Sequence, residues 1–133
     1  MTASPRLGYT IVYVADVAAA LQFYERAFGL KRRFLHDSGL YGELETGATA
    51  LAFAGEPMIA ANGLDLRLNS VSDKAAAVEI GLVTEDVPGL YAQATAAGAV
   101  PVQPPNTKPW GQVVAYVRDC DGILVELCSP MGV

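Results

Sequence analysis

The sequence predicts an α+β fold in which two βαβββ modules in tandem form a cupped mixed sheet around a cleft, with the helices outside. Three observations predict it. The chain contains a partial copy of itself, each copy begins with an alternating strand followed by a capped helix, and 52% of the residues are hydrophobic. With 133 residues of this composition, we expect a single domain that spans residues 1–133.

The internal repeat sets the boundaries of the two modules. Residues 9–30 align with residues 79–100, so we expect the first module at about 7–54, a linker at about 55–76 and the second module at about 77–129. The aligned positions are Tyr9 with Glu79, Asp16 with Asp86, Gly29 with Gly98 after one dropped residue, and Tyr41-Gly42-Glu43 with Trp110-Gly111-Gln112.

The first module reads as a strand, a helix and three further strands. Residues 7–14 alternate and are rich in β-formers. Asp16 is placed to cap a helix, and Gly29 follows the last residue of its apolar spacing. Strands are then expected over residues 31–37, 41–46 and 48–53.

The second module repeats this order. A strand is expected over residues 78–83, a helix from Asp86 to Gly98 with Pro88 in its first turn, and strands over 112–118 and 123–128. The proline-rich residues 101–110 predict a semi-rigid loop. Residues 55–76 form a long connection, which we expect to be a partly ordered lid or crossover.

The charge and the apolar pattern exclude several classes of protein. The net charge of −5 and the pI of about 4.7 argue against a partner that is a nucleic acid or an anionic membrane surface. The sequence has no apolar run of 18 residues and begins without a basic and apolar leader. We therefore expect a cytoplasmic protein with two reduced thiols, Cys120 and Cys128.

Three local motifs connect the repeat to a known family. They are Val14-Ala15-Asp16-Val17, then Phe23-Tyr24 with Ala27-Phe28-Gly29-Leu30, and finally Arg118-Asp119-Cys120-Asp121-Gly122 followed by Leu124-Val125-Glu126-Leu127. Together they resemble the vicinal oxygen chelate superfamily, which includes glyoxalase I, the bleomycin-resistance proteins and the extradiol dioxygenases. The last motif is similar to the closing DPDG-x-x-x-E pattern of that group, with Cys120 in place of proline. The resemblance covers nearly the whole chain and implies the fold, whereas the fold hosts many reactions.

The resemblance also implies where metal ligands would stand, because family members take them from the first and last strand of each module. The matching positions here are Tyr9, Leu51 or Ala52, Glu79 and Glu126. Only Glu126 matches the usual ligand, and an iron site with two histidines is excluded because His36 is the sole histidine. We expect no cofactor and no tight metal. If a divalent metal binds, we expect weakly held Mg²⁺ or Mn²⁺ at Glu79 and Glu126.

Strand parity predicts which side chains line the cup, and an aromatic lining with a few polar groups is typical of a small-molecule pocket. The alternative is that the aromatic residues only fill space, with Glu43 and Glu45 on a solvent-exposed edge. Crowding should raise the pKa of Glu79 or Glu126 unless a guanidinium, most simply that of Arg118, lies nearby. The expected ligand-binding residues are Tyr9, Tyr13, Tyr41, Glu43, Trp110 and Tyr116.

The sequence therefore favours a metal-independent, small-molecule-binding protein of the bleomycin-resistance type that holds an apolar or cationic ligand. The alternative is a glyoxalase-like lyase or isomerase that uses Glu126 or Glu79 as the base, with weakly bound Mg²⁺ or Mn²⁺. Whether the chain is an enzyme is left open. Besides the ligand, the expected partner is a second copy in a homodimer that covers exposed sheet edges.

Overall fold

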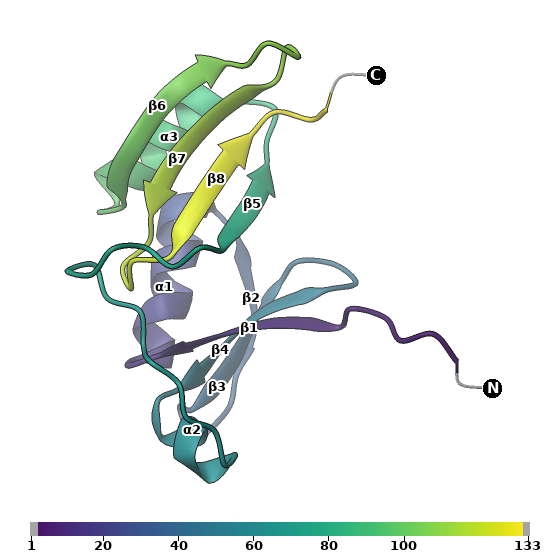
Figure 1. Cartoon of the computed structure of the whole chain (residues 1–133), viewed down its shortest axis with the longest axis vertical. Coiled ribbons are helices and arrows are strands. Elements are labelled where there is room, and N and C mark those ends of the chain that lie inside the picture. The colour runs from purple at the N-terminus through teal and green to yellow at the C-terminus, as the bar shows by residue number, and fades with distance from the viewer. Residues whose placement is uncertain (1–2, 132–133) are drawn as a thin grey trace. The chain divides into compact units, whose positions relative to one another are not determined.

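The computed structural model describes residues 3–131 and contains two compact units (Figure 1). The first unit comprises the chain up to Glu25 together with Leu30–Leu68, and the second comprises Arg26–Gly29 and the chain from Asn69 onward. Each unit holds one four-stranded mixed sheet. The α+β class and the tandem βαβββ order are confirmed, with the strands divided between two sheets.

The first sheet has the strand order β1-β4-β3-β2, with β1 parallel to β4 and the other neighbours antiparallel. A long helix precedes β2 and a short one follows β4. The elements are β1 (Tyr9–Val14), α1 (Val17–Phe28), β2 (Lys31–Leu35), β3 (Tyr41–Glu45), β4 (Ala50–Gly55) and α2 (Pro57–Ala61).

The boundaries of α1 follow the sequence signals. The Asp16 carboxylate accepts a hydrogen bond of 3.0 Å from the backbone N–H of Ala19, which satisfies a free donor at the helix start. Gly29 has a φ of +71°, a left-handed conformation that ends the helix at low cost. The buried face of α1 packs on the first sheet, where the ring of Tyr24 lies 5.1 Å from that of Phe53.

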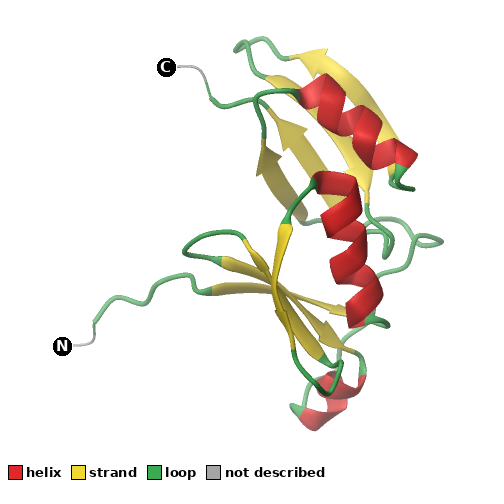
Figure 2. Ribbon diagram, turned by 180° about the vertical axis from the view of Figure 1, so that it is seen from behind, coloured by secondary structure: helices red, strands yellow, loops and turns green. Residues whose placement is uncertain are grey.

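The second sheet repeats this arrangement with the order β5-β8-β7-β6. Helix α3 packs against β6, β7 and β8, and Figure 2 shows it covering one face of this sheet. Asp86 caps α3 through a 3.0 Å hydrogen bond from the N–H of Gly89. The elements are β5 (Glu79–Val83), α3 (Val87–Ala96), β6 (Val100–Thr107), β7 (Val113–Arg118) and β8 (Leu124–Cys128).

The prediction of a loop over residues 101–110 is wrong, because most of this segment is strand β6. β6 is an edge strand that pairs only with β7 in its sheet, so a proline can sit where its missing N–H would face away from the ladder. The pairing shifts register between Pro101 and Gln103 and again between Gln103 and Asn106. These irregularities accommodate the prolines that the sequence analysis took as loop signals.

The connection between the modules is only partly regular. It begins with α2, a helix that the sequence analysis did not predict, and residues 62–78 contain no helix or strand. None of the helices in the described part of the chain has the length and apolar character that crossing a membrane requires.

The tight contact between α1 and the first sheet can be tested at Gly42. A Cβ added there would lie 2.5 Å from Leu21 Cδ1 and 3.1 Å from the Phe34 carbonyl oxygen, whereas a Cβ at Gly81 in β5 would meet nothing within 4 Å. We expect Gly42→Ala to lower the free energy of unfolding by about 1–3 kcal/mol through overpacking. Gly81→Ala should leave it almost unchanged. Urea denaturation followed by circular dichroism compares the two, and equal stability would contradict the packing described.

Candidate functional site

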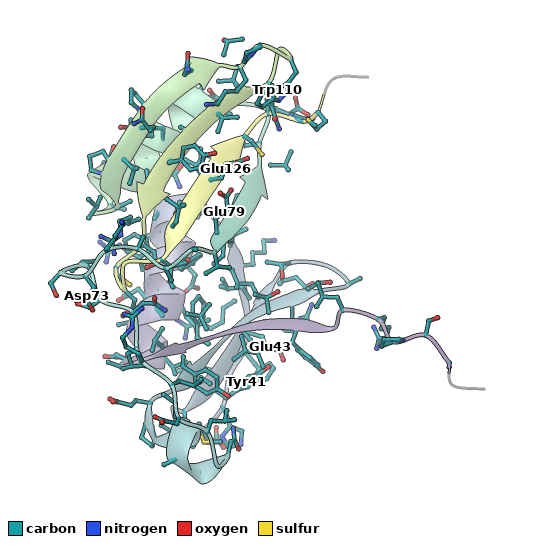
Figure 3. All side chains as sticks on the ribbon, in the orientation of Figure 1. Tyr41, Glu43, Asp73, Glu79, Trp110 and Glu126 are labelled. Carbon is teal, nitrogen blue, oxygen red and sulfur yellow. The ribbon has the colours of Figure 1, made fainter. Side chains whose placement is uncertain are left out.

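Helix α3 covers one face of the second sheet, and the opposite face carries two glutamates side by side (Figure 3). Glu79 lies at the start of β5 and Glu126 in the middle of β8. Tyr116 on β7 is in register with Glu126, and Cys128 is two residues further along β8, on the same side. We call Glu79, Tyr116, Glu126 and Cys128 the acidic cluster.

Hydrogen bonds converge on Glu126. The hydroxyl of Tyr116 donates to Oε1 of Glu126 at 3.0 Å. The side chains of Glu79 and Glu126 interact through a hydrogen bond, for which one of the two carboxyl groups must be protonated. The thiol of Cys128 donates to the Leu82 carbonyl oxygen at 3.7 Å and also acts on Glu126. Glu126 is therefore the acceptor at the centre of the cluster, and Glu79 is the carboxyl of the pair that keeps its proton to higher pH.

The pKa values of Glu79 and Glu126 shift in opposite directions, as expected for a donor and its acceptor. The hydrogen bond to Glu126, followed by burial and the charge of Glu126, raises the pKa of Glu79 above its ordinary value. Burial acts to raise the pKa of Glu126 as well. However, the hydrogen bonds from Glu79, Cys128 and Tyr116, together with the charge of Lys108, lower the pKa of Glu126 overall. Burial and the hydrogen bond to Glu126 raise the pKa of Tyr116 to about 12.

The raised pKa of one carboxyl agrees with the sequence prediction, and the guanidinium of Arg118, which would have reversed the shift, is engaged elsewhere. The guanidinium of Arg118 donates to backbone carbonyls, including that of Gly122 at 2.9 Å. The positive charge that acts on Glu126 comes from Lys108, just beyond the end of β6. The sequence pattern could not show that a loop distant in sequence supplies the acceptors for Arg118.

Two further residues of the second unit bear on the predicted site. Gly81 is in register with Glu126 on β5, and the position of its missing side chain is open space. Trp110 lies in the turn before β7 and is 60% exposed, with its indole N–H bound to the Gln112 side chain at 2.9 Å. The internal alignment matched Trp110 to Tyr41, which begins β3, whereas Trp110 precedes β7 and β7 begins at Val113.

The first sheet holds a second polar group around Glu43. Glu43 is only 7% exposed, so the alternative that placed it at a solvent-exposed edge is wrong. Its carboxylate accepts from the Tyr41 hydroxyl at 2.7 Å and from Arg33 Nη1 at 3.1 Å. Arg33 also pairs with the exposed Glu45 at 2.8 Å. Burial and the hydrogen bond to Glu43 raise the pKa of Tyr41 above its ordinary value.

A bulge in β2, which the sequence analysis did not predict, puts Phe34 on the same face of the sheet as Glu43. Arg32 is in register with Leu44, and Phe34 with Glu43, so Arg33 is an extra residue on β2. Without the bulge, alternation would put Phe34 on the helix side of the sheet. The ring of Phe34 instead lies 5.9 Å from that of Tyr41.

The strand registers correct the internal alignment. Ala52 is in register with Ile11 as Glu126 is with Gly81, so Ala52 and not Leu51 is the counterpart of Glu126. The register also changes which residue of the second module corresponds to Glu43. Glu43 pairs with Ala52 on the neighbouring strand, just as Tyr116 pairs with Glu126. Glu43 therefore corresponds to Tyr116 and not to Gln112. The sequence alignment missed this because the segment between the helix and this strand is longer in the second module.

The structure therefore divides the predicted site residues between the units. Within the second unit it brings Glu79, Tyr116 and Glu126 together. Within the first unit it brings Tyr41 and Glu43 together. Tyr9 and Tyr13 on β1 lie on the same face of the first sheet as these two residues, and Tyr9 is 59% exposed.

Comparison with protein-family models gives a match over most of the chain. The family model described as the Glyoxalase/Bleomycin resistance protein/Dioxygenase superfamily matches residues 6–127. The chain belongs to this superfamily. No match is found among curated protein sequences.

Solved structures of the superfamily share the fold at low sequence identity. A glyoxalase-related enzyme from Fulvimarina pelagi has a TM-score of 0.79 and 19% identity, covering 93% of this chain and 87% of its own. A glyoxalase/bleomycin resistance protein/dioxygenase family enzyme from Burkholderia phytofirmans PsJN has a TM-score of 0.80 and 18% identity, covering 94% and 98%. TioX from Micromonospora sp. ML1 has a TM-score of 0.71 and 23% identity, with the same coverage of 94% and 98%. At these identities, the comparisons establish the fold alone.

The donor atoms of this superfamily member do not fit a resident transition metal. Of the four positions implied by the resemblance, Ala52 offers only a methyl group. The carboxylates of Glu79 and Glu126 are engaged with each other through a proton. Within residues 3–131, no group of three His, Cys, Asp or Glu side chains is arranged to hold a metal ion. Two carboxylates without an imidazole or thiolate are poor ligands for Zn²⁺, Ni²⁺ or Fe²⁺.

The shared proton has a consequence for stability. Because the pKa of Glu79 is raised in the folded protein, its favourable contribution is complete at low pH and is lost as the pH rises through the folded value. Glu79→Gln keeps a hydrogen-bond donor without the charge. We therefore expect this variant to be more stable than the wild type at pH 7, with the difference gone below about pH 4.

A matched substitution in the first unit should behave in the opposite way. The hydrogen bond from Arg33 lowers the pKa of Glu45, so its contribution is present at neutral pH and is lost as the pH falls. Glu45→Gln should be less stable than the wild type at pH 7, and not at low pH. Urea denaturation at both pH values measures the two variants. A Glu79→Gln protein that is destabilised at pH 7 would show that the two carboxylates do not share a proton.

Proposed function

We propose that the chain binds a small organic cation with an apolar body at the acidic cluster, without a metal. The observation that carries the proposal is the Glu79–Glu126 pair, in which two carboxyl groups lie side by side on the face of the second sheet opposite α3 and the interaction raises the pKa of Glu79. Superfamily membership makes a ligand-binding or enzymatic role plausible, and the side chains of the cluster suggest the ligand's charge.

A cationic N–H group suits this pair because it can take the place of the shared proton. Once that proton leaves, two carboxylates face each other and their repulsion is relieved by a positive charge between them. Tyr116 keeps Glu126 oriented through its 3.0 Å hydrogen bond. The vacant side-chain position at Gly81 leaves room beside Glu126, and Val83, which is 66% exposed, offers an apolar contact.

A second candidate is supported by the position of Glu79 on the pKa scale. A carboxyl group with a raised pKa is a better general base near neutral pH than an ordinary glutamate. This supports a lyase or isomerase that removes a proton next to a carbonyl group, with Glu79 as the base. A turnover assay on the hemithioacetal of a 2-oxoaldehyde tests it. A rate equal to that of Glu79→Gln would contradict this candidate.

The binding proposal predicts a charge-dependent affinity. Benzylammonium should bind to the wild type, and benzyl alcohol, its neutral counterpart, should not. Glu126→Gln should weaken benzylammonium binding by about tenfold or more, because it removes the carboxylate that receives the cation. Amide NMR shifts of residues on β5, β7 and β8 provide the measurement.

Glu85→Gln is the matched control, since it removes the same charge from an exposed residue outside the strands of the second sheet. It should bind benzylammonium like the wild type. Equal losses in Glu85→Gln and Glu126→Gln would show that only the net charge of −5 attracts the cation.

The metal-independent form of the proposal makes a prediction of its own. Elemental analysis of the purified protein should find far less than one equivalent of Zn, Ni or Fe per chain, because the donor set is incomplete for these ions. One equivalent of any of them that survives dialysis would overturn it.

We further propose a homodimer as the functional form. Strands β1 and β5 are the outer strands of their sheets, and Tyr9 and Ile11 on β1 are 59% and 42% exposed. Unpaired edges with apolar side chains favour association. Light scattering at micromolar concentration should give twice the chain mass of 14.0 kDa, and a monomer mass would refute this. The ligand-binding roles of Tyr9, Tyr13, Tyr41, Glu43 and Trp110 stay predictions.

A further inference from the structure

Arg118 fastens a loop that is distant in sequence to the end of the second sheet. Its guanidinium donates from Nη2 to the carbonyl oxygens of Ser70 at 3.1 Å and Asp73 at 2.8 Å, and from Nη1 to that of Val71 at 3.3 Å. Its Nε donates to the Gly122 carbonyl at 2.9 Å. One side chain thus joins the β7–β8 turn to residues 70–73, which we call the strap. Figure 3 marks Asp73 on this segment.

The β7–β8 turn is shaped to receive the strap. Gly122 has a φ of +84°, and a Cβ there would lie 2.6 Å from the Ser70 carbonyl oxygen, so only glycine allows this approach. The turn itself is held by Asp119, which is 1% exposed and accepts from the N–H groups of Asp121 at 2.8 Å and Ile123 at 2.9 Å. The strap therefore rests on a rigid support.

The strap leads directly into the acidic cluster. Arg118, Leu124 and Glu79 form one row across β7, β8 and β5, so the end of the sheet that Arg118 occupies is the end where Glu79 stands. Between the strap and β5 the chain contains only residues 74–78, without helix or strand. Fixing the strap fixes the point at which the chain joins β5.

We propose that Arg118 is a positioning residue: it holds the strap on the β7–β8 turn, and so it sets where β5 begins and where the Glu79 carboxylate lies beside Glu126. The inference rests on the proposed function in that it assigns Glu79 to a ligand site. Arginine suits the task because its planar fork of donors reaches several carbonyls at once, which a lysine ammonium on a flexible stem cannot do in one geometry.

Limited trypsin digestion tests whether the strap depends on Arg118. Lys74 follows the strap directly, and Arg67 precedes it and serves as a reference site in the same chain. In the wild type we expect slow cleavage after Lys74 relative to Arg67. Arg118→Met should speed cleavage after Lys74 by about tenfold, because local opening no longer breaks charge-assisted hydrogen bonds. Arg118→Lys should restore protection in part.

Two further variants keep the test decisive. Arg33→Met removes a hydrogen-bonded guanidinium from the first unit and should leave Lys74 as protected as in the wild type. A Cβ at Gly122 would lie 2.6 Å from both the Ser70 carbonyl oxygen and Arg118 Nη2, so Gly122→Ala separates the strap from the turn without removing the guanidinium, and it should also expose Lys74. It replaces Arg118→Met if that variant does not show the circular dichroism of a folded protein.

Positioning is tested by hydrogen exchange and by binding. In Arg118→Met, the amides of residues 79–83 should exchange faster while those of β1 to β4 do not, and benzylammonium should bind about tenfold more weakly. Unchanged cleavage after Lys74 would overturn the strap. Faster cleavage with unchanged exchange in β5 and unchanged affinity would overturn the positioning role. If the wild type itself does not bind benzylammonium, the proposed function fails, whereas digestion and exchange still decide whether Arg118 holds the strap and β5.

Discussion

Each four-stranded sheet has a helix packed on one face, and this constraint decides where polar groups can go. The helix side must be apolar, as the buried Tyr24, Phe53 and Leu44 show in the first unit. Because alternate residues of a strand point to opposite faces, charged side chains in mid-strand are directed to the face without a helix. Neither sheet could hold a carboxylate in mid-strand anywhere else without a partner from the helix.

The two units satisfy their mid-strand carboxylates by different means. Glu43 is almost fully buried and is paired with a guanidinium and a phenol, so its charge is neutralised permanently. Glu126 is paired with the phenol of Tyr116 and with a second carboxyl group, Glu79, which can lose its proton. The first arrangement is suited to holding strands β2 and β3 together. The second can exchange its proton for another positive group, and this difference is the reason for assigning ligand binding to the second unit.

Arg118 connects the sheet that carries the acidic cluster to the segment that leads into β5. A parallel pair such as β5 and β8 needs a long connection, and nothing in the ladder itself fixes where the first of the two strands begins. The carbonyl groups of the strap are backbone groups, so their contact with Arg118 does not depend on which side chains occupy residues 70–73. The contact therefore requires no particular sequence motif in residues 70–73.

Sequence alone determined the features that depend on local rules. Asp16, Asp86, Gly29 and Gly98 mark helix ends because capping and left-handed backbone are properties of single residues. Alternation likewise placed Glu126, Tyr116 and Cys128 on one face.

Tertiary structure decided whatever depends on register and on contacts distant in sequence. The prolines of β6 are compatible with a strand only because that strand lies at an edge, and Phe34 shares a face with Glu43 only because β2 is bulged. The alignment of Glu43 with Gln112 failed for the same reason, since insertions between strands shift the register without changing the local pattern. Register is a property of two strands together, so it cannot be read from either strand by itself.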